Sequence, residues 1–325
     1  MDRKTPDYEA LRPNFGWLSA ARIRKTLENT TQWYRATIHH PFKKHFKSRF
    51  PAANVHRLNE WVATDTIFSD TPAHDDGVPG HGGATMLQLY AGKESSYLAG
   101  FPMKHEGQIP GTAQDFIRKV GAPIGWFSDN AKAACGNAMQ DIARMYNIDD
   151  RQSEPHHQHQ NYAERRIQDV KNLTNNIMDR TGTPKEFWLL CMLYVIFLLN
   201  HMINETTGQV PHTHALGAPT DNSALMSYHW WEPVYYSVDN SFPSTSGEMP
   251  GVWAGVAEDQ GDALTYKVIS QDTKRLLSRS AIRPCNEPLH PNFRANFVAY
   301  PSSNTPADGG GDDTTAHIRD GLHVC

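Results

Sequence analysis

Three acidic residues stand where their carboxylates could meet at one metal site. Asp65 lies in the middle of the β-rich run 62–66, Asp129 ends the run 123–130, and Glu164 opens a long amphipathic stretch. A charge inside a strand is costly unless it is paired or bound to a metal. Oxygen ligands suit Mg²⁺, and two such ions can stabilise the attacking and leaving oxygens of a phosphoryl transfer. The three acids therefore indicate a site for two Mg²⁺ or Mn²⁺ ions.

Each acid also has an ordinary structural role open to it. Asp129 could cap a turn or a helix. Glu164 could be a solvated helix residue, and Asp65 could pair with an arginine. For any one acid alone the ordinary role is the stronger interpretation, and only the joint pattern favours a metal site.

The order of strands and helices around these acids predicts a fold class. Three β-rich runs separated by Gly and Pro clusters suggest successive antiparallel strands, and helices and strands then alternate. This is the order of the ribonuclease-H-like fold, an α/β fold with a mixed sheet flanked by helices. The predicted strands span residues 61–69, 84–92, 95–103, 123–130 and 150–153, and the predicted helices span 110–121, 137–146, 163–179 and 185–202.

Changes in composition divide the chain into five predicted segments. A basic leading segment, or the remnant of an N-terminal domain, covers residues 1–57, and the ribonuclease-H-like core covers 58–205. A connector at 206–249 precedes a small SH3-like β module at 250–290. The tail 291–325 contains a low-complexity stretch that is expected to be disordered.

Charge and hydropathy limit the partners. A net charge of −4 argues against coating nucleic acid with the whole surface, so any DNA site must be local. Residues 22–49 hold eight basic side chains against the single acid Glu28, a run that could track phosphates or be an ordinary solvated face. The wholly apolar run 187–200 is shorter than the roughly 18 residues that span a membrane, which predicts a buried core helix and no membrane partner. The lysines of the basic run chosen as candidate DNA contacts are Lys43, Lys44 and Lys47.

Several ordered motifs are shared with a known family. Ser-Asp-Asn at 128–130 and Gln-Asn-Tyr-Ala-Glu-Arg at 160–165 look like the Asp-Asp-Glu signature of retroviral and retrotransposon integrases, with Thr64-Asp65 supplying the first acid. Downstream stretches at 187–188, 198–201 and 253–283 agree with this likeness. Over about residues 20–285 the chain resembles the integrase region of copia-type (Pseudoviridae-like) retrotransposon polyproteins, in particular copia-like elements of diatoms.

The resemblance implies an activity and its partners. It implies an integrase that uses Mg²⁺ or Mn²⁺ to process DNA 3′ ends and join them to target DNA, with Asp65, Asp129 and Glu164 as catalytic metal ligands. It further implies a homo-oligomer that acts in the nucleus after a stage in cytoplasmic virus-like particles. Lys171, which lies almost on the helical line of Glu164, and Asn161 are the implied DNA contacts on this side.

Departures from the family pattern keep two other functions open. Ala131 stands where the family usually has glycine, and Tyr162 stands where a Gly-x pair usually precedes the Ala-Glu dipeptide. No cysteine precedes Cys135, so the family's His-His-Cys-Cys zinc module is not visible, and the histidines at 156–159 lack zinc-site spacing. A decayed or domesticated copy that binds DNA without cutting it is the first alternative, and a nuclease of the same fold is the second.

Overall fold

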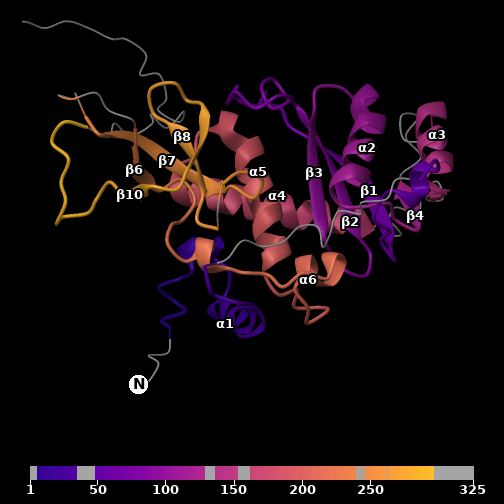
Figure 1. Ribbon diagram of the computed structural model, residues 1–325, viewed down its shortest axis with the longest axis horizontal. Helices are drawn as coiled ribbons and strands as arrows, with labels where there is room; N and C mark the ends of the chain where they lie inside the picture. Colours follow the sequence, from indigo (N-terminus) through magenta and orange to yellow (C-terminus); the bar gives the residue numbers. More distant parts are fainter. Residues whose placement is uncertain are drawn as a thin grey trace, which may run out of the picture.

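Two β-sheets enclose a pair of long helices. The computed structural model describes residues 6–34, 48–128, 136–152, 162–238, 242, 246–261 and 263–295. In Figure 1 helices α2 and α3 lie beyond the first sheet, helices α4 and α5 lie behind it, and the second sheet closes the other end of the molecule. The chain is thus layered, with helix, sheet, helix and sheet in succession.

The first sheet has the strand order of a ribonuclease-H-like fold. Its order is β3-β2-β1-β4-β5, in which β1, β2 and β3 are antiparallel and β4 and β5 run parallel to β1. The predicted fold class is confirmed for this part of the chain. The strands are β1 Trp61–Phe68, β2 Met86–Gly92, β3 Leu98–Met103, β4 Gly125–Ser128 and β5 Asp149–Gln152.

Helices α2 (Ile109–Lys119) and α3 (Asn137–Tyr146) cover one face of this sheet. Pro110 lies in the first turn of α2, where its missing N–H costs no helical hydrogen bond. The buried Phe116 of α2 stacks on Tyr90 of β2 at 4.7 Å between ring centroids and meets Trp126 of β4 at 5.5 Å. These aromatic contacts join β2, α2 and β4 into one core.

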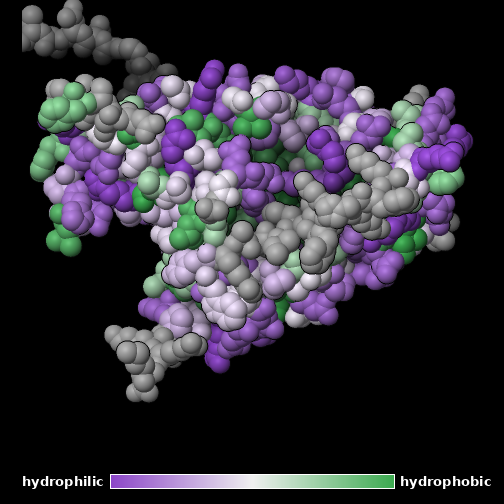
Figure 2. All heavy atoms as spheres, in the orientation of Figure 1, coloured by the Kyte–Doolittle hydropathy of each residue, from purple (hydrophilic) through white to green (hydrophobic). Residues whose placement is uncertain are grey.

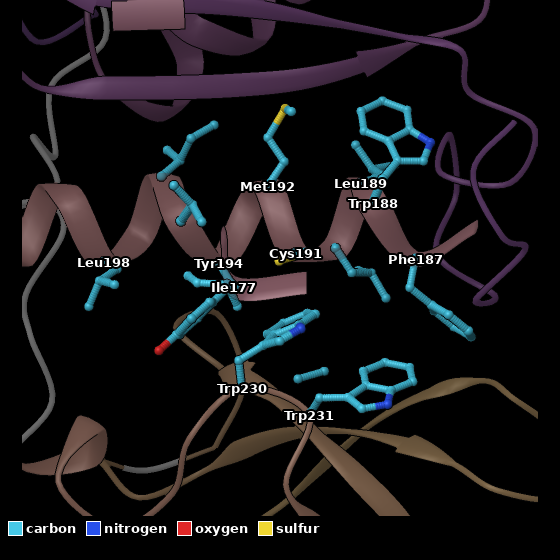
Figure 3. Close-up of a cluster of buried hydrophobic side chains, with 14 of the residues drawn as sticks. Ile177, Phe187, Trp188, Leu189, Cys191, Met192, Tyr194, Leu198, Trp230 and Trp231 are labelled. Carbon is cyan, nitrogen blue, oxygen red and sulfur yellow. The ribbon is translucent and has the colours of Figure 1, made fainter. Parts of the chain in front are cut away.

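Helices α4 (Tyr162–Thr181) and α5 (Trp188–His201) cover the opposite face. In α4 the residues Val170, Thr174 and Ile177 are buried, at the spacing of one helical face. α5 is buried nearly all round, because the first sheet lies on one side of it and the second sheet on the other. In Figure 3 Trp188 and Met192 point toward the first sheet, and Tyr194 points toward Trp230. None of the described helices is long and apolar enough to cross a membrane.

An asparagine of α5 closes part of the free edge of the first sheet. The side-chain oxygen of Asn200 accepts a hydrogen bond of 2.8 Å from the N–H of Leu98, and its amide donates one of 2.7 Å to the carbonyl of the same residue. Because β3 is an edge strand, these backbone groups have no neighbouring strand to pair with. The side chain thus replaces one residue of a missing strand.

The second sheet is antiparallel throughout, with the order β10-β6-β7-β8-β9. Its last strand returns to pair beside its first, which is the compact arrangement expected of a small β module. The domain boundaries given above remain predictions, and β6 lies inside the segment predicted as a connector. The strands are β6 Pro233–Ser237, β7 Glu248–Val256, β8 Tyr266–Ser270, β9 Leu276–Arg279 and β10 Ile282–Pro284.

The leading residues pack on the core. Ser19 caps helix α1 (Ala20–Asn29) by accepting a hydrogen bond from the N–H of Arg22, and Ile23 is fully buried in the core around α5. The guanidinium of Arg22 donates to the carbonyl of Ile203 at 2.8 Å. The remaining short helices are η1 Pro13–Phe15, η2 Pro51–Ala53, η3 Glu106–Gln108, η5 Lys185–Phe187, η6 Ser223–Leu225 and α6 Pro211–Leu216.

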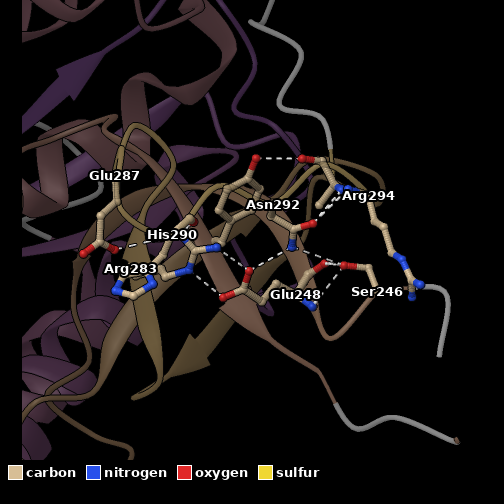
Figure 4. Close-up of polar contacts among 9 residues, drawn as sticks. Ser246, Glu248, Arg283, Glu287, His290, Asn292 and Arg294 are labelled. Carbon is tan, nitrogen blue, oxygen red and sulfur yellow. Dashed lines mark hydrogen bonds and ion pairs between the residues drawn. The ribbon is translucent and has the colours of Figure 1, made fainter. Parts of the chain in front are cut away.

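An arginine and a glutamate join strands β7 and β10 of the second sheet to the segment that follows them. Arg283 of β10 donates two hydrogen bonds of 2.6 Å to the carboxylate of Glu248 on β7, and Asn292 adds one of 2.8 Å (Figure 4). These hydrogen bonds, that of Arg283 above all, lower the pKa of Glu248. The carboxylate therefore stabilises the folded chain as long as it is ionised.

Replacing Leu198, a fully buried residue of α5, by alanine should lower the free energy of unfolding by about 2–5 kcal/mol, because the change leaves a cavity between the two sheets. Urea denaturation measures the loss. Leu289→Ala, at a residue that is 84% exposed, is the matched control and should change stability by less than about 0.5 kcal/mol. Equal effects of the two substitutions would contradict the assignment of α5 as the central core helix.

The Arg283–Glu248 pair predicts a pH-dependent contribution to stability. Because its folded pKa is lowered, Glu248 stabilises the chain above about pH 4.3, the ordinary value for glutamate, and this contribution is lost as pH falls through the folded pKa. Glu248→Gln should therefore destabilise the chain by about 1–2 kcal/mol at pH 7 and by less near pH 3. Thermal unfolding across this pH range tests the expectation, with the exposed Glu94→Gln as control. A loss that does not depend on pH would contradict it.

Candidate functional site

Asp65 lies in the centre of the first sheet, on the face that α4 covers. Its direct cross-strand neighbour is Leu89 of β2, which is fully buried in the core around α5. Ile67, two residues further along β1, belongs to the same core, and side chains two apart in a strand share a face. Asp65 itself is half-buried, and its Oδ1 accepts a hydrogen bond of 2.7 Å from the N–H of Thr66. The sheet therefore directs this carboxylate toward the helical layer that contains α4.

The parallel pairing of β1 with β4 brings the end of β4 to the level of Asp65. Ser128, the last residue of β4, lies opposite Thr64, the residue before Asp65. Asp129, the predicted second acid, lies outside the described residues. The last described residue of β4 is therefore level with the middle of β1.

Glu164 is an exposed residue in the first turn of α4. The hydroxyl of Tyr162, the first residue of this helix, shares a hydrogen bond of 2.9 Å with the hydroxyl of Ser96 in the turn between β2 and β3. Gly92 at the beginning of that turn pairs with Val62 of β1, three residues before Asp65. The start of α4 therefore lies near the Val62 end of β1, and the three residues from Val62 to Asp65 span about 10 Å of the strand.

Other acidic residues after β1 do not join this arrangement. Asp70 and Asp75 are exposed, and the almost fully buried Asp76 accepts hydrogen bonds from the N–H of Val78 and, at 2.8 Å, from Nδ1 of His81. Within the described part of the chain no three His, Cys, Asp or Glu side chains form a group that could hold a metal ion. Since Asp129 lies outside that part, the convergence of the three acids stays a prediction.

The predicted DNA contacts are described only in part. Lys171 is exposed on α4 and lies seven residues after Glu164, about 20° away around the helix. Lys43, Lys44, Lys47 and Asn161 lie outside the described residues, as do Ala131 and the histidines at 156–159. Lys171 and Glu164 therefore share one exposed line along α4, as the sequence predicts.

A glutamine that the sequence analysis did not single out fixes the strand carrying Asp65. The buried Gln88 of β2 donates through its amide to the hydroxyl of Thr64 at 2.5 Å and accepts from the hydroxyl of Thr66 at 2.6 Å. These contacts lie on the face opposite Asp65 and join the two strands on both sides of its position. In the sequence, a single glutamine within an otherwise apolar strand could have indicated that its side chain makes buried hydrogen bonds.

Comparisons with known proteins find likeness in structure and none in sequence. No family profile matches the chain, and no curated protein matches it. Among solved structures, the chain is similar to the catalytic core domain of HTLV-2 integrase in complex with magnesium in its trimeric form, with 15% identity and a TM-score of 0.38, covering 48% of this chain and 96% of that one. The dimeric form gives 16% identity and a TM-score of 0.36, covering 48% and 94%.

A longer match includes residues beyond the core. It is a chain of the simian T-cell lymphotropic virus intasome, solved in complex with PP2A regulatory subunit B56 gamma. The identity is 12% and the TM-score 0.39, covering 71% of this chain and 83% of that chain.

Proposed function

We propose that the chain is a polynucleotidyl transferase of the integrase type, which processes DNA 3′ ends and joins them to a second duplex. The observation that carries the proposal is the position of Asp65. It is a half-buried carboxylate in the central strand of a ribonuclease-H-like sheet, on the face covered by the helix that bears Glu164. Carboxylate oxygens suit divalent metal ions, and such ions are what phosphoryl transfer on DNA requires.

The donor set suits divalent ions of the Mg²⁺ or Mn²⁺ kind. Asp65, Asp129 and Glu164 offer carboxylate oxygens only, which are the ligands that these ions prefer. We propose that the three acids hold two ions, one by Asp65 and Asp129 and the other by Glu164 together with Asp65 or Asp129. When bound, such ions supply charge stabilisation for the attacking and leaving oxygens of a phosphodiester.

The remaining roles fall to residues around the acids. Lys171 is proposed to contact DNA phosphates from the exposed line of α4 that also bears Glu164, and Asn161 is proposed to contact DNA just before that helix. Lys43, Lys44 and Lys47 are proposed to extend the phosphate contacts. A copia-type origin, a homo-oligomeric assembly on DNA, and action in the nucleus after a stage in cytoplasmic particles complete the proposal.

A second candidate function is DNA binding without cleavage, and Tyr162 favours it. Sequences that this chain resembles usually have a Gly-x pair before the Ala-Glu dipeptide, whereas here the single residue Tyr162 stands there and joins the start of α4 to Ser96 through its hydroxyl. A bulky, hydrogen-bonded residue restricts how α4 can adjust when substrate binds. A displacement of about 1 Å at Glu164 is enough to reduce catalysis about a hundredfold.

The activity is tested by joining a labelled DNA 3′ end to a second duplex in Mg²⁺ or Mn²⁺. The parent chain should form the joined product, and Asp65→Asn, Asp129→Asn and Glu164→Gln should each reduce it to the level seen without metal while DNA binding persists. Asp70→Asn, which changes an exposed acid just after β1, is the matched control and should retain activity. Binding without joining in the parent chain would favour the second candidate function. Full activity in Asp65→Asn would refute the proposed site.

The basic segment before β1 is tested by the salt dependence of DNA binding. Each neutralised phosphate contributes about −0.9 to the slope of log affinity against log salt, so replacing Lys43, Lys44 and Lys47 together by alanine should flatten that slope by about two to three. Affinity should fall alike for all DNA sequences. Alanine at the exposed Lys93 and Lys185 serves as control. An unchanged slope in the triple variant would assign this segment to the solvated surface.

A further inference from the structure

A cavity of about 430 Å³ lies between the two sheets, away from Asp65 and Glu164. On the side of the first sheet it is bounded by strand β3 and one face of α5. On the side of the second sheet it is bounded by the end of β7 and by residues of β8 and β9. Figure 2 shows a recess between the two sheets, with hydrophobic residues at its bottom. The volume is in the range of small-molecule sites, which often lie where two domains meet.

One wall of this cavity is apolar. Leu193 and Phe197, four residues apart on α5, are half-buried there, whereas most of the helix is fully buried. Residues at this spacing lie one above the other on a helix, so the two side chains form a continuous strip. Such a strip offers a surface for an apolar ligand body.

The opposite wall carries a lysine that forms no ion pair with the described residues. Lys267 of β8 is half-buried and lies opposite Ser278 of β9, and both residues line the cavity. No hydrogen bond or ion pair joins its ammonium group to the described residues. Burial lowers the pKa of Lys267 even though Glu258 and Asp259 stand nearby, and Lys119 lowers it further. A half-buried cation normally has a directly paired counter-charge, and although Glu258, Asp259 and Asp76 raise the pKa of Lys267, none of them forms an ion pair with it.

The nearby acids do not take that place. Asp259 is exposed at the rim, and Glu258 is only half-buried. The two carboxylate oxygens of Asp76 are already hydrogen-bonded to the N–H of Val78 and to the ring of His81. The cavity therefore combines an apolar strip with a half-buried positive charge that has no direct ion pair among the described residues.

We propose that this cavity binds a small amphipathic organic anion, whose acidic group pairs with Nζ of Lys267 and whose apolar body lies against Leu193 and Phe197. The acidic group of the ligand supplies a direct ion-pair partner for Lys267, and the apolar body of the ligand covers the strip formed by Leu193 and Phe197. The proposal does not depend on DNA cleavage by the chain.

The probe for the test is 8-anilinonaphthalene-1-sulfonate, an aromatic anion whose fluorescence rises in apolar surroundings, and the full chain is titrated with it. Binding should saturate, and Lys267→Met, which removes the charge but keeps an apolar stem, should weaken it at least about tenfold, as expected for the loss of a charge-assisted hydrogen bond. Lys185→Met changes an exposed lysine outside the cavity and is the matched control.

A second ligand separates the charge from the apolar body. 1-Anilinonaphthalene has the same rings without the sulfonate, and Lys267→Met should leave its affinity unchanged, whereas Phe197→Ala should weaken both ligands. Lys267→Arg keeps the charge and should retain binding of the sulfonate, which guards against a methionine variant that fails to fold. Sulfonate binding that is unsaturable, or equal in the parent chain and a folded Lys267→Met variant, would overturn the proposal.

Discussion

The burial of α5 between the two sheets is the constraint on which the rest of the structure depends. A helix that is apolar on all sides can be stable only if every side is covered, and full burial of a large apolar side chain is worth about 1.5–3 kcal/mol. The first sheet covers one side through Leu87 and Leu98, and Trp230 and Trp253 cover the other from the second sheet and the segment before it. The two sheets are therefore held together by one shared core.

This shared core also sets the position of the candidate site. α4 packs against both α5 and strand β1, so its register along the sheet follows from the packing of Val170 and Ile177. The start of α4 is fixed a second time, by the hydrogen bond between Tyr162 and Ser96. Glu164 is thus placed by long-range packing along the helix and by the contact of Tyr162 at its start, which together restrict how the helix can move over the sheet.

Much of the fold could be predicted from local pattern, because alternation in strands and spacing in helices depend only on neighbouring residues. The strand containing Asp65 and the buried helix at 185–202 are confirmed for that reason. The elements that cover α5 could not be predicted. A helix that is apolar on every side gives no indication of which side faces which neighbour. The partners of Gln88 and the cavity beside Lys267 join residues far apart in the chain, so local pattern could at most single out Gln88 and could not predict its contacts. The convergence of Asp65, Asp129 and Glu164 stays a prediction because Asp129 lies outside the described residues.

The side chain of Asn200 has a consequence for how copies of this chain can meet. Extension of a sheet from one molecule into the next requires free N–H and C=O groups on an edge strand. At Leu98 both groups are already taken by one amide, and Pro102, further along the same strand, has no N–H to offer. A second copy cannot continue the first sheet across this edge at Leu98. Contacts between copies at this point of β3 must therefore use side chains and not a shared sheet.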